Sequence, residues 1–304
     1  MNRRIRQVGG CIAVFAVTGC AGTLEAARAD TATACKAPSG WEQVAAAAEH
    51  KVLVFGETHG TNEMPDAFAR YVCAASAKGG RTLVLLEINT DHEAAITAAS
   101  EAADPHAALL NGLPQHWSNT DGRGSRAMLG MMERLIALRQ GGRDLTIAPM
   151  DQLTGWPEME SPEELSAWLA VQPPTKTQQM RDSGMAEKIN AASEGFDRTI
   201  VLVGNVHARK AGLEVLPDVS LMTMLVPDAI SLLVVHDGGT AWVNSGDSVG
   251  VVEQYKLNRT GLLANSMELI PEGLPAYPGD KPAYDGYVSV GAITASEPAL
   301  PASN

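Results

Sequence analysis

Four short apolar runs, of the kind that fold as buried β-strands, constrain the fold of this chain most. They occupy residues 52–55, 82–86, 145–148 and 199–203, and stretches of helical pattern separate them. Strands that are apolar throughout are typical of a parallel sheet whose two faces are both covered by helices. The alternation therefore predicts an α/β fold with an open, mostly parallel sheet and helices on both faces.

Two segments near the C-terminal end lie outside this alternation. Residues 231–236 and 240–244 flank an Asp-Gly-Gly turn, which predicts an added hairpin. Residues 275–304 are rich in proline, alanine and serine and are expected to form a tail. With an N-terminal extension over 30–49, the α/β domain is expected to span 50–274, and 304 residues suit one domain with additions.

The first 29 residues have the pattern of an export signal. Arginines at positions 3, 4 and 6 precede an apolar stretch that is shorter than the roughly 20 residues a membrane span needs. Val-Thr-Gly-Cys over 17–20 resembles a lipobox, which would make Cys20 a lipid-carrying N-terminus that anchors the protein to a membrane. Cleavage after Ala29 would instead release a soluble periplasmic protein. We favour the lipobox, and hence a periplasmic or outer-membrane lipoprotein of a Gram-negative bacterium.

Export would place the remaining cysteines in an oxidising compartment. After cleavage at Cys20, only Cys35 and Cys73 remain to pair with each other. A disulfide between them would fasten the N-terminal segment to the domain. The alternative is two unrelated thiols, and the spacing does not decide between these two interpretations.

The charge of the chain excludes one class of partner. The formal net charge is −12. So acidic a protein is a poor candidate for binding nucleic acid, which needs a basic surface.

The sequence contains no phosphate-binding glycine loop, dinucleotide fingerprint or serine-hydrolase elbow. The oligomeric state is not indicated.

Polar residues follow each of the four predicted strands. Glu57 and His59 come after the first strand, Glu87 after the second, and His207 after the fourth, while the third ends near Asp151. An open parallel sheet binds its ligands outside the carboxyl ends of its strands. The sequence therefore predicts a functional cleft at this edge of the sheet.

These residue types suit two kinds of chemistry. Glu57 and His59 are two residues apart at a strand end, so both side chains can leave on the same side. A carboxylate can orient a histidine that acts as a general base on water. Alternatively His59, Glu87 and His207 could bind Zn, Mn, Co or Fe. A structural interpretation also stays open, in which Glu57 caps the following helix and Glu87 pairs with an arginine.

Arg181 lies on a predicted helix over residues 176–192. It shares a face with Met185 and Ile189, which follow at helical spacing. Its stem could lie on the core while the charged head points to solvent. Alternatively, the guanidinium reaches into the cleft, where it would stabilise an oxyanion.

These motifs resemble those of the erythromycin-esterase-like, ChaN-like and Tiki/TraB superfamily. The resemblance covers about residues 50–240 and rests on Gly-Glu-Thr-His-Gly at 56–60, Glu87 in Leu-Leu-Glu-Ile, Arg181 in Arg-Asp-Ser-Gly-Met-Ala, and Gly-Asn-Val-His ending at His207. It implies a parallel α/β fold with the motif residues in one cleft. Erythromycin-esterase-like members hydrolyse a macrolactone with a histidine base, Tiki-like members resemble metalloproteases, and ChaN-like members are haem-binding surface lipoproteins.

The first hypothesis is an exported hydrolase that acts on an ester or amide of a small molecule or peptide. His59 would activate water, oriented by Glu57, while Glu87 and His207 complete a proton relay or a metal site and Arg181 stabilises the oxyanion. The alternative is a non-enzymatic, haem-binding lipoprotein of iron uptake, with His59 or His207 as axial ligand. Four Phe and five Tyr are few to line a haem slot.

Overall fold

The structure is a computed structural model in which most of the chain beyond residue 34 is described. The described residues are 35–155, 157, 161–216, 218–244, 246, 249–257, 262–275 and 281–300. The predicted leader, with Cys20 and Ala29, lies outside them. Within the described ranges, no helix is long and apolar enough to cross a membrane.

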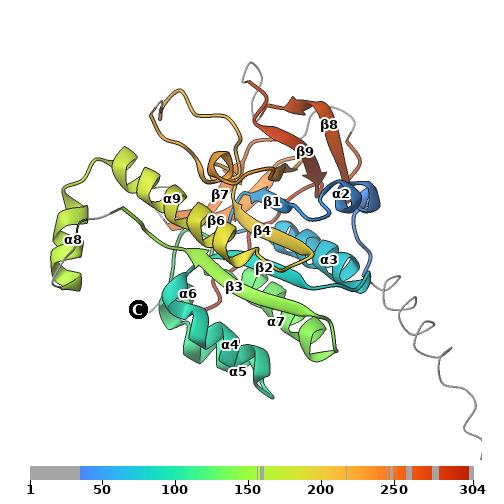
Figure 1. Ribbon diagram of the computed structural model, residues 1–304, viewed down its shortest axis with the longest axis horizontal. Coiled ribbons are helices and arrows are strands. Elements are labelled where there is room, and N and C mark those ends of the chain that lie inside the picture. Colours follow the sequence, from blue (N-terminus) through green and yellow to red (C-terminus); the bar gives the residue numbers. More distant parts are fainter. Residues whose placement is uncertain are drawn as a thin grey trace, which may run out of the picture.

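A seven-stranded sheet runs through the centre of the molecule in the order β3-β2-β4-β1-β5-β9-β8 (Figure 1). Its strands are β1 Val52–Glu57, β2 Thr82–Asn89, β3 Leu145–Asp151, β4 Arg198–Gly204, β5 Ile230–Val235, β8 Ser266–Leu274 and β9 Tyr284–Ser289. Every neighbouring pair is parallel except β8 with β9, which is antiparallel. The predicted open, mostly parallel sheet is confirmed.

Helices lie on both faces of this sheet (Figure 1). In chain order they are α2 Trp41–Ala47, α3 Glu63–Ala77, α4 Glu93–Glu101, α5 Pro105–Gly112, α6 Pro114–Trp117, α7 Arg126–Gln140, α8 Pro162–Ala170 and α9 Pro174–Ala192, with short 3₁₀ turns η1 Thr90–His92 and η2 Met222–Leu225. The predicted α/β class is therefore confirmed as well.

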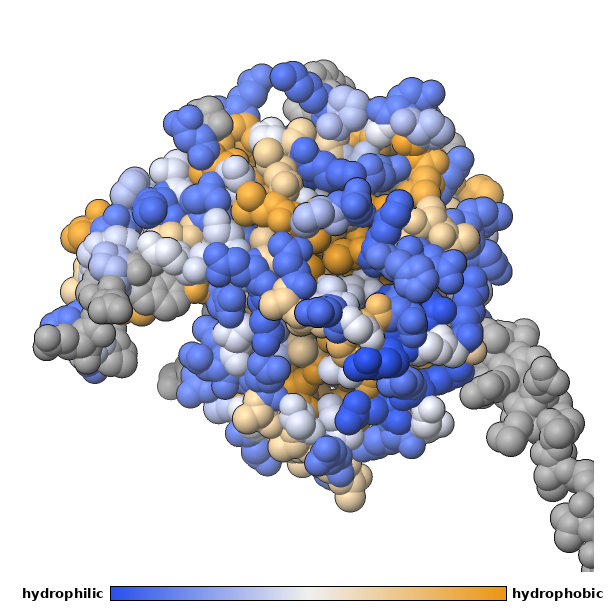
Figure 2. Space-filling model, in the orientation of Figure 1, coloured by the Kyte–Doolittle hydropathy of each residue, from blue (hydrophilic) through white to orange (hydrophobic). Residues whose placement is uncertain are grey.

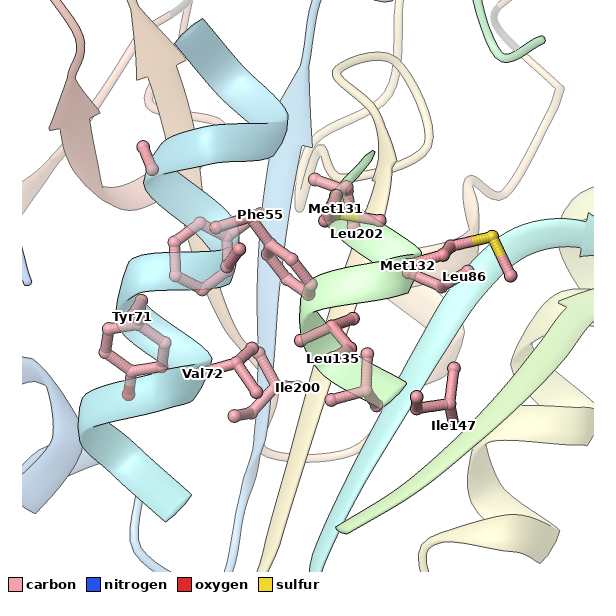
Figure 3. Packing of buried hydrophobic residues seen from close by; sticks show 14 of the residues in the cluster. Phe55, Tyr71, Val72, Leu86, Met131, Met132, Leu135, Ile147, Ile200 and Leu202 are labelled. Carbon is pink, nitrogen blue, oxygen red and sulfur yellow. The ribbon is translucent and has the colours of Figure 1, made fainter. Parts of the chain in front are cut away.

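Two separate hydrophobic cores form because successive strand residues point to opposite faces. Leu53 and Phe55 of β1 belong to the core under α3 and α7. Val52 and Val54 of the same strand belong to the core under α9 and η2. Figure 3 shows the first core, where Phe55 and other strand residues meet the side chains of α3 and α7. Burial on both faces explains why the strands are apolar throughout.

The added hairpin is present, but one of its predicted strands is wrong. Strand β6, Gly239–Asn244, pairs antiparallel with β7, Val249–Gln254. Residues 231–236, predicted as the first strand of the hairpin, instead overlap β5, Ile230–Val235, which lies parallel between β1 and β9. All six residues of β5 are buried, which suits an interior strand and not one arm of a surface hairpin.

The domain continues past the boundary predicted at residue 274. Strand β9 lies inside the segment expected to be a tail, yet it pairs with β5 on one side and β8 on the other. Residues 291–300 then run back over the carboxyl end of the sheet and bond to β6 and to two loops. A composition rich in proline, alanine and serine misled the prediction, because strand pairing is set by partners elsewhere in the chain.

Cys35 and Cys73 form a disulfide, with 5.5 Å between their Cα atoms. Cys73 lies on α3, so the bond ties the start of the described chain to the helix that follows β1. Of the two interpretations that the sequence left open, the structure has the disulfide.

Candidate active site

A polar cleft lies at the carboxyl ends of β1, β2 and β4. The register pairs Glu57 at the end of β1 with Gly204 at the end of β4. The chain after β1 enters α3 on one face of the sheet, whereas the chain after β4 leads to η2 on the other. Neighbouring strands that diverge in this way open a crevice between them, which is the usual ligand site of such sheets.

The cavity in this crevice measures about 350 Å³. It is lined by Glu57, Thr58, His59, Glu87, Asp121, Arg123, Arg181, Gly204, Asn205, Val206, His207, Val243 and Asn244. All five catalytic candidates from the sequence are therefore in one place. A larger, open hollow of about 640 Å³ lies beside α2 and β8, but no histidine or arginine lines it, so the polar cleft is the better candidate.

His59 is held by Glu57 and faces Glu87. Its Nδ1 lies 3.0 Å from Oε1 of Glu57, and its Nε2 lies 3.5 Å from Oε2 of Glu87. The Glu57 side chain is buried, while that of His59 keeps 20% of its surface exposed. His59 thus presents Nε2 to the cleft with its ring orientation fixed from behind.

The pKa values of His59 and Glu57 are both raised. Burial alone would lower the pKa of His59, but the negative charge of Glu87 and the bond to Glu57 outweigh it and raise that pKa. Burial raises the pKa of Glu57, and the attraction of His59 only partly offsets this. Both groups therefore bind protons more tightly than they would in water.

Glu87 lies on the floor of the cleft and accepts hydrogen bonds from three other residues. Its Oε2 accepts the backbone N–H of Gly204 at 2.7 Å, and its Oε1 accepts bonds from Arg123 at 3.2 Å and from Arg181. Burial alone would raise the pKa of Glu87, but the two guanidiniums and the two histidines lower it well below its usual range. Glu87 therefore stays an ionised acceptor between the two guanidiniums.

Arg181 reaches into the cleft and does not point to solvent. Its Nε and Nη2 donate to both oxygens of Asp151, at 2.8 and 2.7 Å, and Nη2 also donates to Glu87. Such a bidentate pair fixes a guanidinium in orientation as well as in position. The carboxylates outweigh the effect of burial and raise the pKa of Arg181, so it remains a cation.

His207 is oriented by a carboxylate on α9. Asp182 is fully buried, and its Oδ1 lies 2.7 Å from Nδ1 of His207 and accepts the N–H of Met222 at 2.8 Å. On the other side of the ring, Nε2 lies 3.2 Å from Nη1 of Arg181. Because a guanidinium can only donate, this Nε2 is the acceptor, and the proton of the neutral ring belongs on Nδ1.

Sequence reasoning missed Arg123 and Asp182. Arg123 stands in the loop between α6 and α7, where no periodic pattern marks a residue, yet it bonds to Glu87, Asp121 and Asp151. Asp182 did leave a signal. At helical spacing it shares a face with buried residues of α9, and a carboxylate on an apolar face requires a partner.

The donors predicted for a metal do not fit a cation as they are arranged. His59, Glu87 and His207 do converge, with Nε2 of His207 3.8 Å from Oε1 of Glu87. However, Arg123 and Arg181 both donate hydrogen bonds to Glu87. Arg181 also donates to Nε2 of His207, the nitrogen that a metal would need. Within the described residues, no group of three or more His, Cys, Asp or Glu side chains is arranged to hold a metal ion.

Haem does not fit the lining of the cleft either. A haem site needs a broad apolar slot, and most binding pockets for such ligands are predominantly apolar. Here the apolar side chains are Val206 and Val243, at the rim of a charged floor. His207 is closed off by Asp182 and Arg181, which leaves its ring nitrogens engaged.

The fold and the cleft together define an α/β protein with a mostly parallel sheet and a polar cleft at the carboxyl ends of its strands. Among solved structures, a protein from Bacillus cereus matches with a TM-score of 0.60 and 12% identity over 90% of this chain and 99% of its own. A succinoglycan biosynthesis protein matches with a TM-score of 0.59 and 11% identity over 90% and 99%. A histidine-to-asparagine variant of the erythromycin esterase EreC, in its open conformation, matches with a TM-score of 0.54 and 12% identity over 84% and 93%.

Identities this low show the fold alone. The predicted resemblance to the erythromycin-esterase-like group is confirmed at that level. No family model matches the chain, and no curated protein matches its sequence. What the cleft does must therefore be argued from its own residues.

Proposed function

We propose that this protein is an exported hydrolase that cleaves an ester or amide bond, with His59 as its general base. The observation that carries this proposal is the setting of His59, whose Nδ1 is held 3.0 Å from Glu57 while Nε2 faces the cleft. A base that is oriented by a carboxylate and open to substrate is the recurring arrangement for activating water.

In the proposed reaction, Nε2 of His59 takes a proton from water as the water oxygen attacks the carbonyl carbon. Glu57 accepts the Nδ1–H bond and stabilises the imidazolium that forms. The bond between the carbonyl carbon and the leaving oxygen or nitrogen then breaks, and His59 returns the proton to that leaving atom. General base catalysis of this kind contributes roughly 10²- to 10⁴-fold.

Arg181 is the group that would stabilise the oxyanion. Within the described residues, four of its five guanidinium N–H bonds are engaged by Asp151, Glu87 and His207. One Nη1–H is left for a substrate oxygen. Because Asp151 and Glu87 fix the guanidinium in advance, it does not have to reorganise as charge develops, which is the basis of oxyanion stabilisation.

Export and lipid attachment at Cys20 are part of the same proposal. The disulfide between Cys35 and Cys73 supports export, because such bonds persist in oxidising compartments. We propose no metal and no haem, since Glu87 and His207 are already engaged by guanidiniums and by Asp182, which leaves only His59 with a free nitrogen.

The test is hydrolysis by the mature protein, produced with export so that the disulfide forms. The substrates are a series of nitrophenyl esters and an acyl nitroanilide. We expect His59→Ala to lower the rate at least about 100-fold while the melting temperature changes little. His106→Ala is the matched control, because this exposed histidine pairs with Glu133 away from the cleft. Full activity in His59→Ala would overturn the proposal.

A further inference from the structure

The last described residues, 291–300, form a C-terminal strap that runs along the outside of the cleft walls. The strap bonds to three separate walls of the site: β6, the loop that carries His59, and the start of α7. These walls come from distant parts of the sequence. Val243 lies on β6, His59 lies in its own loop, and Arg123 lies in the loop directly before α7, and all three line the cleft.

The strap first runs beside β6. Thr240 donates its backbone N–H to the carbonyl of Ile293 at 3.0 Å, and Ile293 donates to the carbonyl of Gly238 at 3.0 Å. A Cβ on Gly239 would lie 1.9 Å from the carbonyl oxygen of Ile293. Only glycine therefore permits the two backbones to approach this closely.

The strap then fastens the loop after His59. The carbonyl of Gly60 accepts the N–H of Ser296 and the N–H of Trp242, both at 2.9 Å. Two residues on, Asn62 donates its N–H to the carbonyl of Thr294 at 3.0 Å. The residue next to His59 is thus bonded to the strap and to β6 at once.

On its other side, the strap caps α7. The first N–H groups of a helix have no partner within the helix. Here Arg126 donates to the carbonyl of Glu297 at 2.8 Å, and Ala127 donates to Oγ of Ser296 at 3.0 Å. The strap therefore supplies two of the first acceptors of α7, directly after the loop of Arg123.

We propose that the C-terminal strap is a positioning element of the active site, with Ser296 joining the His59 loop to the first turn of α7. Ser296 is 1% exposed and bonds to one wall through its N–H and to the other through its hydroxyl. The strap adds no strand to the seven-stranded sheet in the described part of the chain; Ile293 anchors it in the core, and its later bonds go to the walls of the cleft. The two bonds of Ser296 brace the His59 loop against the first turn of α7. The catalytic meaning of this brace rests on the proposed role of His59.

Amide hydrogen exchange tests the brace without any substrate, using three substitutions at one position. Ser296→Ala removes the hydroxyl, and we expect about fivefold faster exchange in the first turn of α7 only. Ser296→Pro removes the N–H as well, and we expect faster exchange at Asn62 in addition. Ser296→Thr keeps the hydroxyl and is expected to restore protection of α7. Ser76→Ala is the matched control, a buried serine whose hydroxyl bonds within α3.

The outcomes distinguish the brace from a simple helix cap. They also distinguish failure of the brace from failure of the proposed hydrolase function. If Ser296→Pro leaves Asn62 protected, Ser296 is only a helix cap and the brace is overturned. For an ester that the protein hydrolyses, Ser296→Pro is expected to lower kcat while KM stays nearly constant, because the strap lines no part of the cavity. Faster exchange at both walls in a protein that hydrolyses no ester would support the brace and contradict the proposed hydrolase.

Discussion

At the scale of single residues, Glu57 and His59 set the pH at which the cleft can work. The charges of Glu87 and Glu57 raise the pKa of His59 above 6.5, against the effect of burial. A general base acts only when it is unprotonated, so we expect kcat/KM to rise with pH through a pKa above 6.5. Glu57→Gln removes one of the negative charges, which lowers the pKa of His59 and moves this rise to lower pH.

A pH profile of kcat/KM for both proteins checks this expectation. A rise that stays at the same pH in Glu57→Gln would mean that Glu57 does not tune the pKa of His59.

The raised pKa of His59 also predicts how stability depends on pH. The contribution of protonated His59 to stability is complete below pH 6.5 and is lost as the pH rises through the folded-state pKa.

Asp182 is expected to act on the reaction through His207 and Arg181. Its buried carboxylate holds Nδ1 of His207 at 2.7 Å, and His207 in turn receives a bond from Arg181. Hydrogen bonds to charged groups contribute roughly 1.5–3 kcal/mol. We expect Asp182→Asn to lower kcat about 10- to 100-fold. Asp144→Asn, at an exposed carboxylate before β3, is the control, and equal rates in the two variants would contradict the role of Asp182.

At the scale of elements, the end of β4 shapes the space around His59. A Cβ on Gly204 would lie 3.0 Å from Nε2 of His59 and 3.5 Å from Oε2 of Glu87. Gly204→Ala is therefore expected to push the imidazole aside by a few tenths of an ångström. Misplacement of a catalytic group can lower the rate by up to about 100-fold, and we expect a loss of kcat with the fold intact.

Gly130→Ala is the control for that variant. Gly130 lies within α7, and a Cβ there would meet no atom within 4 Å. Alanine in a helix interior is more stable than glycine by roughly 0.5–1 kcal/mol. We therefore expect Gly130→Ala to raise the melting temperature and to leave activity unchanged. Activity that survives in Gly204→Ala would show that His59 has more room than the structure gives it.

At the scale of the whole molecule, charge limits what the cleft can accept. The net charge of the chain is −12, and hydrophilic residues predominate on the face drawn in Figure 2. In and beneath the cleft, carboxylates outnumber the guanidiniums of Arg123 and Arg181. The carboxylates are those of Glu57, Glu87, Asp121, Asp151 and Asp182. The site is therefore net negative while the histidines are neutral.

We expect neutral or cationic esters to be hydrolysed faster than anionic esters of the same shape. The measurement is kcat/KM for a choline-type ester, its uncharged isostere and a carboxylate-bearing analogue at two salt concentrations. The advantage of the cationic ester should shrink at high salt, because the Debye length falls from about 10 Å at 0.1 M to about 3 Å at 1 M. A preference for the anionic ester would show that Arg123 or Arg181 is freer than its contacts imply.

The sequence by itself determined the strands and the residues at their carboxyl ends. Runs that are apolar on both faces can only be buried in a sheet covered on both sides, so β1, β2, β3 and β4 were predictable from local pattern. The placement of Glu57, His59, Glu87 and His207 in one cleft followed from the shared edge of parallel strands. Apart from the pairing of Glu57 with His59, only the tertiary structure decided the partners of these residues.

Arg123 meets Glu87 across 36 positions of sequence, and His207 meets Asp182 across 25. The strap meets Gly60 from the far end of the chain, and β5 pairs with β9 and not with β6. No local pattern encodes such contacts. Which buried charge finds which partner, and which strand finds which neighbour, depends on how distant segments pack. Local periodicity records only whether a residue is buried, and not what it is buried against.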